Sequence, residues 1–171
     1  MKKNKLIISV MVAALLIVID QLVKIFVLEF LKPLGIVTAI DGLLEFTYVE
    51  NTGVAFGLFQ NTPWITLVAT AIGCLVVTIL ALRYKYHNFL SVSAAVLIIS
   101  GGIGNIIDRF IYGFVVDYIH VMFFDYVFNF ADCCVSVGAV LLVGYILFFN
   151  PENGKRTKLG KSTEEEKKEE V

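Results

Sequence analysis

Four long apolar runs constrain this chain more than any other feature of its sequence. A helix that crosses the hydrocarbon core of a bilayer needs about 20 mostly apolar residues. Runs of this kind occupy about residues 6–28, 63–82, 89–107 and 130–149. Charged residues make up only 17% of the 171 residues and hydrophobic residues 58%, and a soluble core of this size cannot bury so much apolar surface. The sequence therefore predicts an all-α membrane protein with four transmembrane helices.

The first apolar run also has features of a secretory signal peptide, because Lys2, Lys3 and Lys5 precede it. However, Asp20 and Gln21 follow the apolar stretch without a small-residue cleavage site, and the apolar pattern then resumes. A cleaved signal peptide would end in such a site. We therefore expect this run to be a retained span.

Lysine and arginine cluster at three places that a four-span topology puts on one side of the membrane. These places are residues 2–5, 83–87 and 155–158. The opposite side holds only Lys32 and Arg109. Because cytoplasmic loops carry the excess of basic residues, we expect both termini to be cytoplasmic and residues 29–62 and 108–129 to be extracytoplasmic.

The segments outside the spans differ in character. Residues 29–62 include alternating apolar and other side chains from Leu44 to Tyr48, which predicts a small extracytoplasmic β-rich segment. Residues 108–129 are rich in Phe and Tyr, as expected of chain that lies along the membrane–water interface. Residues 150–171 combine many charges with no apolar periodicity, which predicts a disordered cytoplasmic tail.

Two ionisable residues interrupt the first span. Asp20 and Lys24 are four residues apart, so they share one face of a helix and can pair. Ionisable groups within spans are costly and often functional. The spacing is equally consistent with a structural pair whose charges cancel.

A polar face also follows the glycines of the third span. Asn105, Asp108 and Arg109 stand at positions i, i+3 and i+4, directly after Gly101-Gly102-Ile103-Gly104. The glycines are consistent with close helix packing. Packing does not explain the three polar residues.

Two further carboxylates are predicted to meet near the outer membrane surface. Asp117 lies in an apolar stretch after the third span, and Asp132 lies where the fourth begins, with Asn129 as a candidate helix cap. Two close carboxylates in a partly dry site share a proton. One then acts as a base toward water and the other donates to a carbonyl oxygen, which is aspartic-protease chemistry.

Spacing alone leaves other interpretations open. A polar-lined transporter or channel, or a structural charge network, fits the same residues. His120 as a base and a Ser100–Lys24 protease are weaker alternatives. The cysteines at 74, 133 and 134 have no CxxC spacing, so we expect neither a disulfide framework nor a metal site.

The same residues form four ordered blocks over roughly residues 15–140 that resemble the bacterial lipoprotein signal peptidases (signal peptidase II). The blocks are Asp20-Gln21-x-x-Lys24, Asn51-Thr52-Gly53-Val54-Ala55-Phe56, Gly101 to Arg109, and Val116-Asp117 with Asn129-Phe130-Ala131-Asp132. The resemblance implies an aspartic endopeptidase of the bacterial plasma membrane. Such an enzyme removes the signal peptide of a prolipoprotein by cleaving before the cysteine that carries diacylglycerol.

Carried over by position, the resemblance makes Asp117 and Asp132 the catalytic pair. It also implies a set of residues that bind substrate or support the site: Asp20, Lys24, Asn51, Gly53, Asn105, Asp108, Arg109, Asn129 and Ala131. Val54 replaces a frequent alanine and Cys133 a common serine. We expect a peptidase domain over residues 1–149, diacylglyceryl-prolipoprotein substrates and membrane lipids as partners, no nucleic acid, no cofactor or metal, and a monomer.

Overall fold

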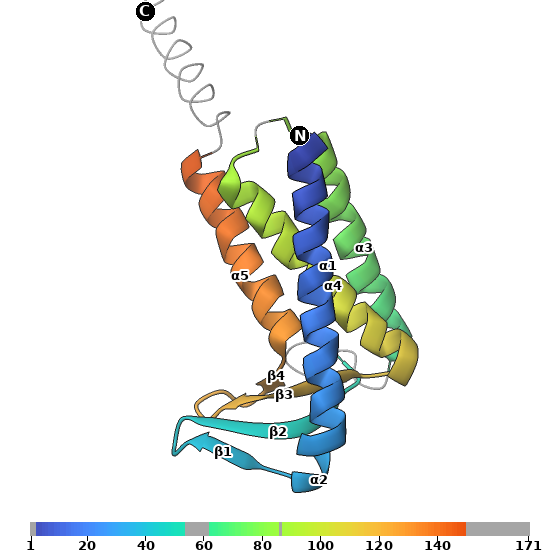
Figure 1. Ribbon diagram of the computed structural model, residues 1–171, viewed down its shortest axis with the longest axis vertical. Coiled ribbons are helices and arrows are strands. Elements are labelled where there is room, and N and C mark those ends of the chain that lie inside the picture. Colours follow the sequence, from blue (N-terminus) through green and yellow to red (C-terminus); the bar gives the residue numbers. More distant parts are fainter. Residues whose placement is uncertain (1–2, 54–61, 86, 150–171) are drawn as a thin grey trace, which may run out of the picture.

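The computed structural model describes residues 3–53, 62–85 and 87–149 (Figure 1). It contains four helical segments long and apolar enough to cross a membrane, namely Lys3–Leu34, Trp64–Arg83, Phe89–Tyr112 and Phe130–Phe149. A small antiparallel sheet lies at one end of the bundle (Figure 1). The predicted fold class is therefore confirmed. The predictions for the tail and for Val54 lie outside the described residues.

The helices extend somewhat beyond the predicted spans. Their bounds are α1 Lys3–Phe26, η1 Val27–Leu31 (a π-helical turn), α2 Lys32–Leu34, α3 Pro63–Arg83, α4 Phe89–Tyr112, α5 Phe130–Gly144 and η3 Tyr145–Phe149. The first span was expected to end near residue 28, but η1 and α2 prolong its path to Leu34. Gly35 then ends it with φ +80°, a positive-φ conformation that glycine adopts at little cost.

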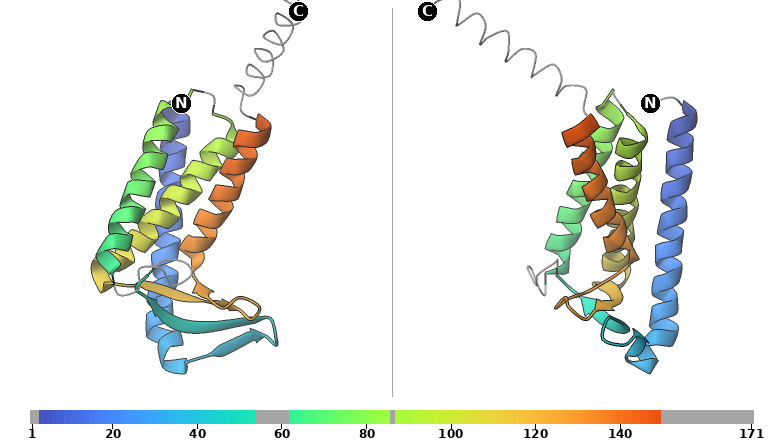
Figure 2. Two further views of the ribbon diagram at one scale, coloured as in Figure 1. Left: turned by 180° about the vertical axis from the view of Figure 1, so that it is seen from behind. Right: turned by 90° about the vertical axis from the view of Figure 1, so that its left-hand side faces the viewer.

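Helix α4 lies at the centre of the bundle and packs against α1, α3 and α5 (Figures 1 and 2). Glycines of α4 and α5 permit the close packing of these two helices. A Cβ added at Gly101 would meet the carbonyl oxygen of Ala131 in α5, and one added at Gly138 would lie 3.0 Å from the carbonyl oxygen of Ala94. The interpretation of Gly101 as a packing residue is thus confirmed.

The third span is longer than predicted. It was expected over residues 89–107, but α4 continues to Tyr112 and ends at Gly113, which has φ +80° and donates its N–H to Arg109 O at 3.1 Å. At the other end, Asn88 and Ser91 form a reciprocal capping box. The extension keeps the polar residues from 105 to 109 on one rigid helix.

The sheet contains β1 Val37–Ile40, β2 Leu44–Asn51, β3 Val115–Val121 and β4 Val127–Phe128, in that order and all antiparallel. Strand β2 confirms the β-rich segment predicted within residues 29–62. Strand β3 was missed, because residues 108–129 were expected to lie along the interface. Its sequence alternates poorly between apolar and polar residues, since Val115 to Tyr118 are buried on both faces of the sheet.

One face of β3 packs on the end of the first span. Val116 and Tyr118 form a buried cluster with Val27 and Leu31 of η1. Because successive side chains of a strand point to opposite faces, Asp117 is directed to the other side. The sheet therefore holds this carboxyl over the end of the helical bundle.

Candidate active site

The two carboxyl groups of Asp117 and Asp132 come from different elements. Asp117 lies in β3 and is only 1% exposed. Asp132 is the third residue of α5, where Asn129 caps the helix as predicted: its Oδ1 accepts from Asp132 N at 2.9 Å, and Asp132 Oδ2 accepts from Asn129 N at 3.3 Å. This reciprocal cap fixes the Asp132 side chain at the positive end of the α5 dipole.

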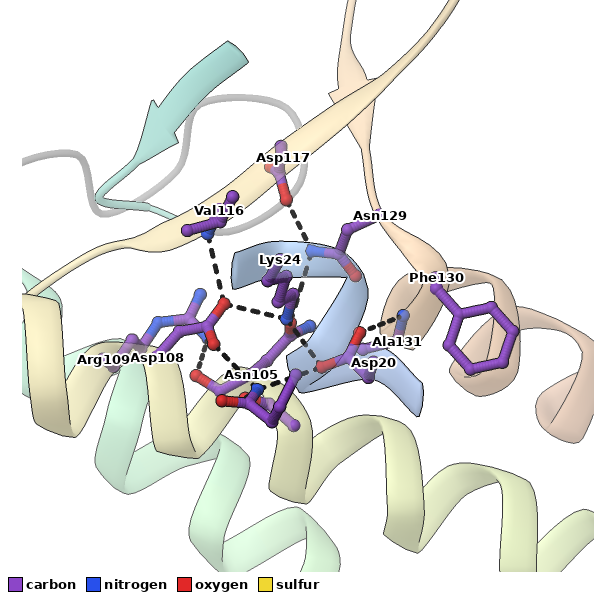
Figure 3. Close-up of polar contacts among 12 residues, drawn as sticks. Asp20, Lys24, Asn105, Asp108, Arg109, Val116, Asp117, Asn129, Phe130 and Ala131 are labelled. Atoms are coloured by element: carbon purple, nitrogen blue, oxygen red, sulfur yellow. Dashed lines mark hydrogen bonds and ion pairs between the residues drawn. The ribbon is translucent and has the colours of Figure 1, made fainter. Parts of the chain in front are cut away.

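Asparagine side chains join the two carboxyl groups, and Figure 3 shows the contact between Asn129 and Asp117. Asn129 Nδ2 donates to Asp117 Oδ1 at 2.5 Å, and Asn51 Nδ2 donates to Asp117 Oδ2 at 2.8 Å. Asn105 Nδ2 donates to Asp132 Oδ1 at 2.7 Å. Asn129 therefore contacts both aspartates, which belong to one hydrogen-bonded unit.

Both aspartates line one pocket of about 940 Å³. Polar residues of the site, including Asn105 and Arg109, line it together with apolar residues of α5 such as Val135 and Val137. A pocket of this size is within the range of small-molecule sites. The apolar residues of α5 form one wall of this pocket, beside the carboxyl pair.

The environment of Asp117 favours its protonated form. Burial, reinforced by the charge of Asp132, raises the pKa of this carboxyl from its ordinary value of 3.8 to about 7. The hydrogen bonds from Asn51 and Asn129 lower the pKa but do not offset burial. Asp117 therefore titrates near neutral pH.

A buried ion network lies beneath the pair (Figure 3). Lys24 Nζ contacts Asp20 Oδ2 at 2.9 Å, Asp108 Oδ2 at 2.8 Å and Asn105 Oδ1 at 2.9 Å. Gln21 Nε2 donates to both carboxylates, at 3.2 Å to Asp20 and 3.0 Å to Asp108. The predicted Asp20–Lys24 pair is present, and Asp108 joins it across the helix interface.

This network also holds the backbone next to each aspartate of the pair. Asp108 Oδ2 accepts from Val116 N at 3.1 Å, and Asp20 Oδ1 accepts from Ala131 N at 3.1 Å. These amides belong to the residues directly before Asp117 and Asp132. Gly104 leaves room for the Asp20 carboxylate, which a Cβ at that position would meet.

Arg109 holds the turn that follows β2 and has a spare donor. Its Nη2 donates to Gly53 O at 2.8 Å, and Gly53 N donates to Asn51 Oδ1 at 3.0 Å. Arg109 Nε is buried and has no hydrogen-bond partner among the described residues. The guanidinium lines the pocket, so it is a candidate donor to a bound molecule.

The sequence profile of signal peptidase II matches residues 12–148. The chain belongs to the signal peptidase II family. It is 43% identical to a lipoprotein signal peptidase of Clostridioides difficile over 84% of this chain and 97% of the relative. It is 40% identical to one of Fusobacterium nucleatum over 80% of this chain and 84% of the relative.

Solved structures of bacterial membrane enzymes share the fold of this chain. Two bacterial membrane enzymes determined by the in meso method, at 2.3 and 1.9 Å, give TM-scores of 0.75 and 0.73 with 27% and 26% sequence identity. They cover 81% and 83% of this chain, which covers 87% and 94% of theirs. The protein is thus a multi-pass membrane protein of a peptidase family.

The structure of this signal peptidase II family member brings the predicted site residues together. They are Asp20, Lys24, Asn51, Gly53, Asn105, Asp108, Arg109, Asp117, Asn129, Ala131 and Asp132. Sequence reasoning missed Gln21, although its polar side chain within an apolar run is a usable signal. It also missed Tyr118, whose hydroxyl accepts from Phe130 N at 3.3 Å and which only tertiary packing identifies.

The weaker protease alternatives lack the required contacts among the described residues. Ser100 Oγ donates to Leu97 O at 3.1 Å, whereas Lys24 is held by its carboxylate partners. His120 Nδ1 lies 3.6 Å from Glu45 Oε2. Successive side chains of a strand point to opposite faces, so His120, three residues after Asp117 in β3, points to the face opposite Asp117.

Proposed function

We propose that this protein is an aspartic endopeptidase that removes the signal peptides of diacylglyceryl-modified prolipoproteins by cleaving before the lipidated cysteine. Family membership supports the processing of prolipoprotein signal peptides. The observation that carries the aspartic mechanism is the bridging of Asp117 and Asp132 by Asn129 within one pocket.

The two carboxyls differ in position, because Asp132 lies at the positive end of the α5 dipole whereas Asp117 lies in a strand. Asp132 accepts hydrogen bonds from Asn105 and Asn129 at the start of α5, which stabilises its ionised form. Burial favours the protonated form of Asp117 and so raises its pKa. Asp132 is therefore the proposed base and Asp117 the proposed acid.

In the proposed reaction, Asp132 removes a proton from water as the water oxygen attacks the scissile carbonyl. Asp117 donates its proton to the carbonyl oxygen, which gives a neutral tetrahedral diol. The C–N bond then breaks as the amide nitrogen receives the proton held by Asp132, and Asp117 recovers a proton from the diol. Arg109, which lines the pocket, is proposed to orient the peptide.

The site suits a substrate that is anchored by lipid. The pair lies where the bundle meets the sheet, at the end of the helices (Figure 1). We propose that this end faces the extracytoplasmic surface and that both termini are cytoplasmic. A diacylglyceryl cysteine diffuses in the membrane plane, so its peptide bond reaches the pair at this depth.

We propose that the protein works as a monomer.

Cleavage of a synthetic diacylglyceryl-modified prolipoprotein peptide by the purified protein tests this proposal. We expect a single cut before the modified cysteine and no cut in the same peptide without diacylglycerol. Equal processing of the unmodified peptide would contradict the substrate assignment. Solute flux into proteoliposomes without cleavage would instead favour a transporter.

The orientation is tested by reporter fusions. Because Arg83 and Lys85 mark a basic link between α3 and α4, a reporter fused after Arg83 is expected to be cytoplasmic. A reporter inserted near Asp41, in the hairpin between β1 and β2, is expected to be external. An external signal at Arg83 would contradict the four-span topology.

The pH profile tests the protonation states. Because the acid form of Asp117 is required, kcat/KM is expected to fall as pH rises through about 7. The hydrogen bond from Asn51 lowers this pKa, so Asn51→Ala should move the alkaline limb to higher pH while reducing the rate. Asn4→Ala, an exposed change on α1, is the control. A limb that stays in place or moves to lower pH would refute the assignment.

A further inference from the structure

A second cavity lies far from the carboxyl pair, between α1, α3 and the start of α4. It measures about 190 Å³ and is lined by apolar residues including Leu6, Val10, Ala13, Leu82 and Val96. At this end of the bundle, α1 stands apart from the other helices (Figure 2). The small side chain of Ala13 contributes to the space between them.

The few polar side chains in the wall of this cleft already have partners. Ser9 Oγ donates to Lys5 O at 2.8 Å, and Thr78 Oγ1 donates to Cys74 O at 2.7 Å. His87 Nε2 lies 2.6 Å from Ala81 O. The cleft therefore presents hydrocarbon to an occupant and leaves no polar group of these residues to be satisfied.

The size of the cleft restricts what fills it. A helix with its side chains is about 10–12 Å across, so even one helical turn needs more space than the 190 Å³ of this cleft. A single extended hydrocarbon chain fits such a space and restores the dispersion contacts that an empty wall lacks. An acyl chain of a surrounding lipid is the occupant with this shape and chemistry.

Exposed cations surround the same end. Lys5 directly precedes Leu6, Arg83 directly follows Leu82, and Lys85 lies two residues before His87, all next to residues of the cleft wall. Every acidic residue of the described segments lies between residues 20 and 50 or between 108 and 132. Positive charges at a membrane surface attract anionic headgroups.

We propose that this cleft binds one acyl chain of an anionic phospholipid, whose headgroup lies against Lys5, Arg83 and Lys85. The site is independent of the carboxyl pair and of the proposed peptidase activity. It would tie α1 to the rest of the bundle at the end opposite the sheet. The bound lipid is thus a structural ligand.

The test measures lipid retention by native mass spectrometry of the purified full chain, mixed with phosphatidylglycerol or with phosphatidylcholine of identical acyl chains. Ala13→Leu fills the cleft from α1, and Ala95→Leu fills it from α4. Ala14→Leu is the matched control, because Ala14 is the neighbouring residue of α1 but is exposed. The double variant Arg83→Gln/Lys85→Gln removes two cations.

We expect wild type and Ala14→Leu to retain one phosphatidylglycerol in preference to phosphatidylcholine, and both filling variants to lose it. The charge variant keeps Lys5, so it should bind phosphatidylglycerol more weakly, by roughly fivefold per cation removed, and show a smaller preference over phosphatidylcholine. Normal retention in both filling variants, equal loss in Ala14→Leu, or no preference in wild type would each overturn the proposal. Cleavage activity, assayed in parallel, shows whether the variants are folded.

Discussion

Replacing either Asp117 or Asp132 with asparagine is expected to reduce cleavage of a lipidated prolipoprotein peptide by at least about 10³-fold, because each change removes a proton donor or acceptor that the reaction needs. Asparagine keeps the size of the side chain. Its carbonyl oxygen still accepts a hydrogen bond from the surrounding asparagine amides, such as Asn51 and Asn129. Both variants should therefore remain folded and membrane-inserted, as size-exclusion chromatography and thermal unfolding will report.

The double variant Asp117→Asn/Asp132→Asn should be little worse than either single variant, since residues that act as a unit are strongly non-additive. Asp125→Asn is the matched control: Asp125 lines the same pocket but is outside the hydrogen-bonded pair, so activity should change only slightly. Near-normal cleavage by either single variant would refute the catalytic pair.

Lys24→Ala is expected to lower the free energy of unfolding by about 3–5 kcal/mol, because it leaves buried carboxylates without their cation. Lys24 is 1% exposed, and its partners Asp20 and Asp108 are 2% and 0% exposed. Lys32→Ala is the matched control. Lys32 and Glu50 form a pair at 3.4 Å whose side chains are 50% and 48% exposed, and solvent screens such pairs. Denaturant unfolding in detergent measures both.

The double variant Asp20→Ala/Lys24→Ala should recover part of the stability that Lys24→Ala loses, because one uncompensated carboxylate is removed with the cation. Activity should recover less, since Ala131 N then loses its acceptor next to Asp132. Strictly additive losses of stability in the double-mutant cycle would show that Asp20 and Lys24 do not interact.

The sequence alone predicts most of the membrane architecture. Apolar runs of about 20 residues have few alternatives to a transmembrane helix, so the spans follow from local composition. Helical spacing also predicts the Asp20–Lys24 pair, because residues four apart meet on one face whatever surrounds the helix. The Asn129 cap is local for the same reason, because both of its capping hydrogen bonds are made with Asp132, three residues later in the first turn of α5.

The site required contacts between residues far apart in the sequence. Strand β3 is covered on both faces and lacks a clear alternation, so its place beside β2 depends on pairing with a strand about 70 residues earlier. Likewise, Asp108 contacts Lys24 and Val116, and Asp20 contacts Ala131. Local patterns determine helices, caps and spans because these depend on neighbouring residues. Only the tertiary structure decides which backbone amides each buried carboxylate holds, because those partners meet only when the helices pack and the sheet closes over them.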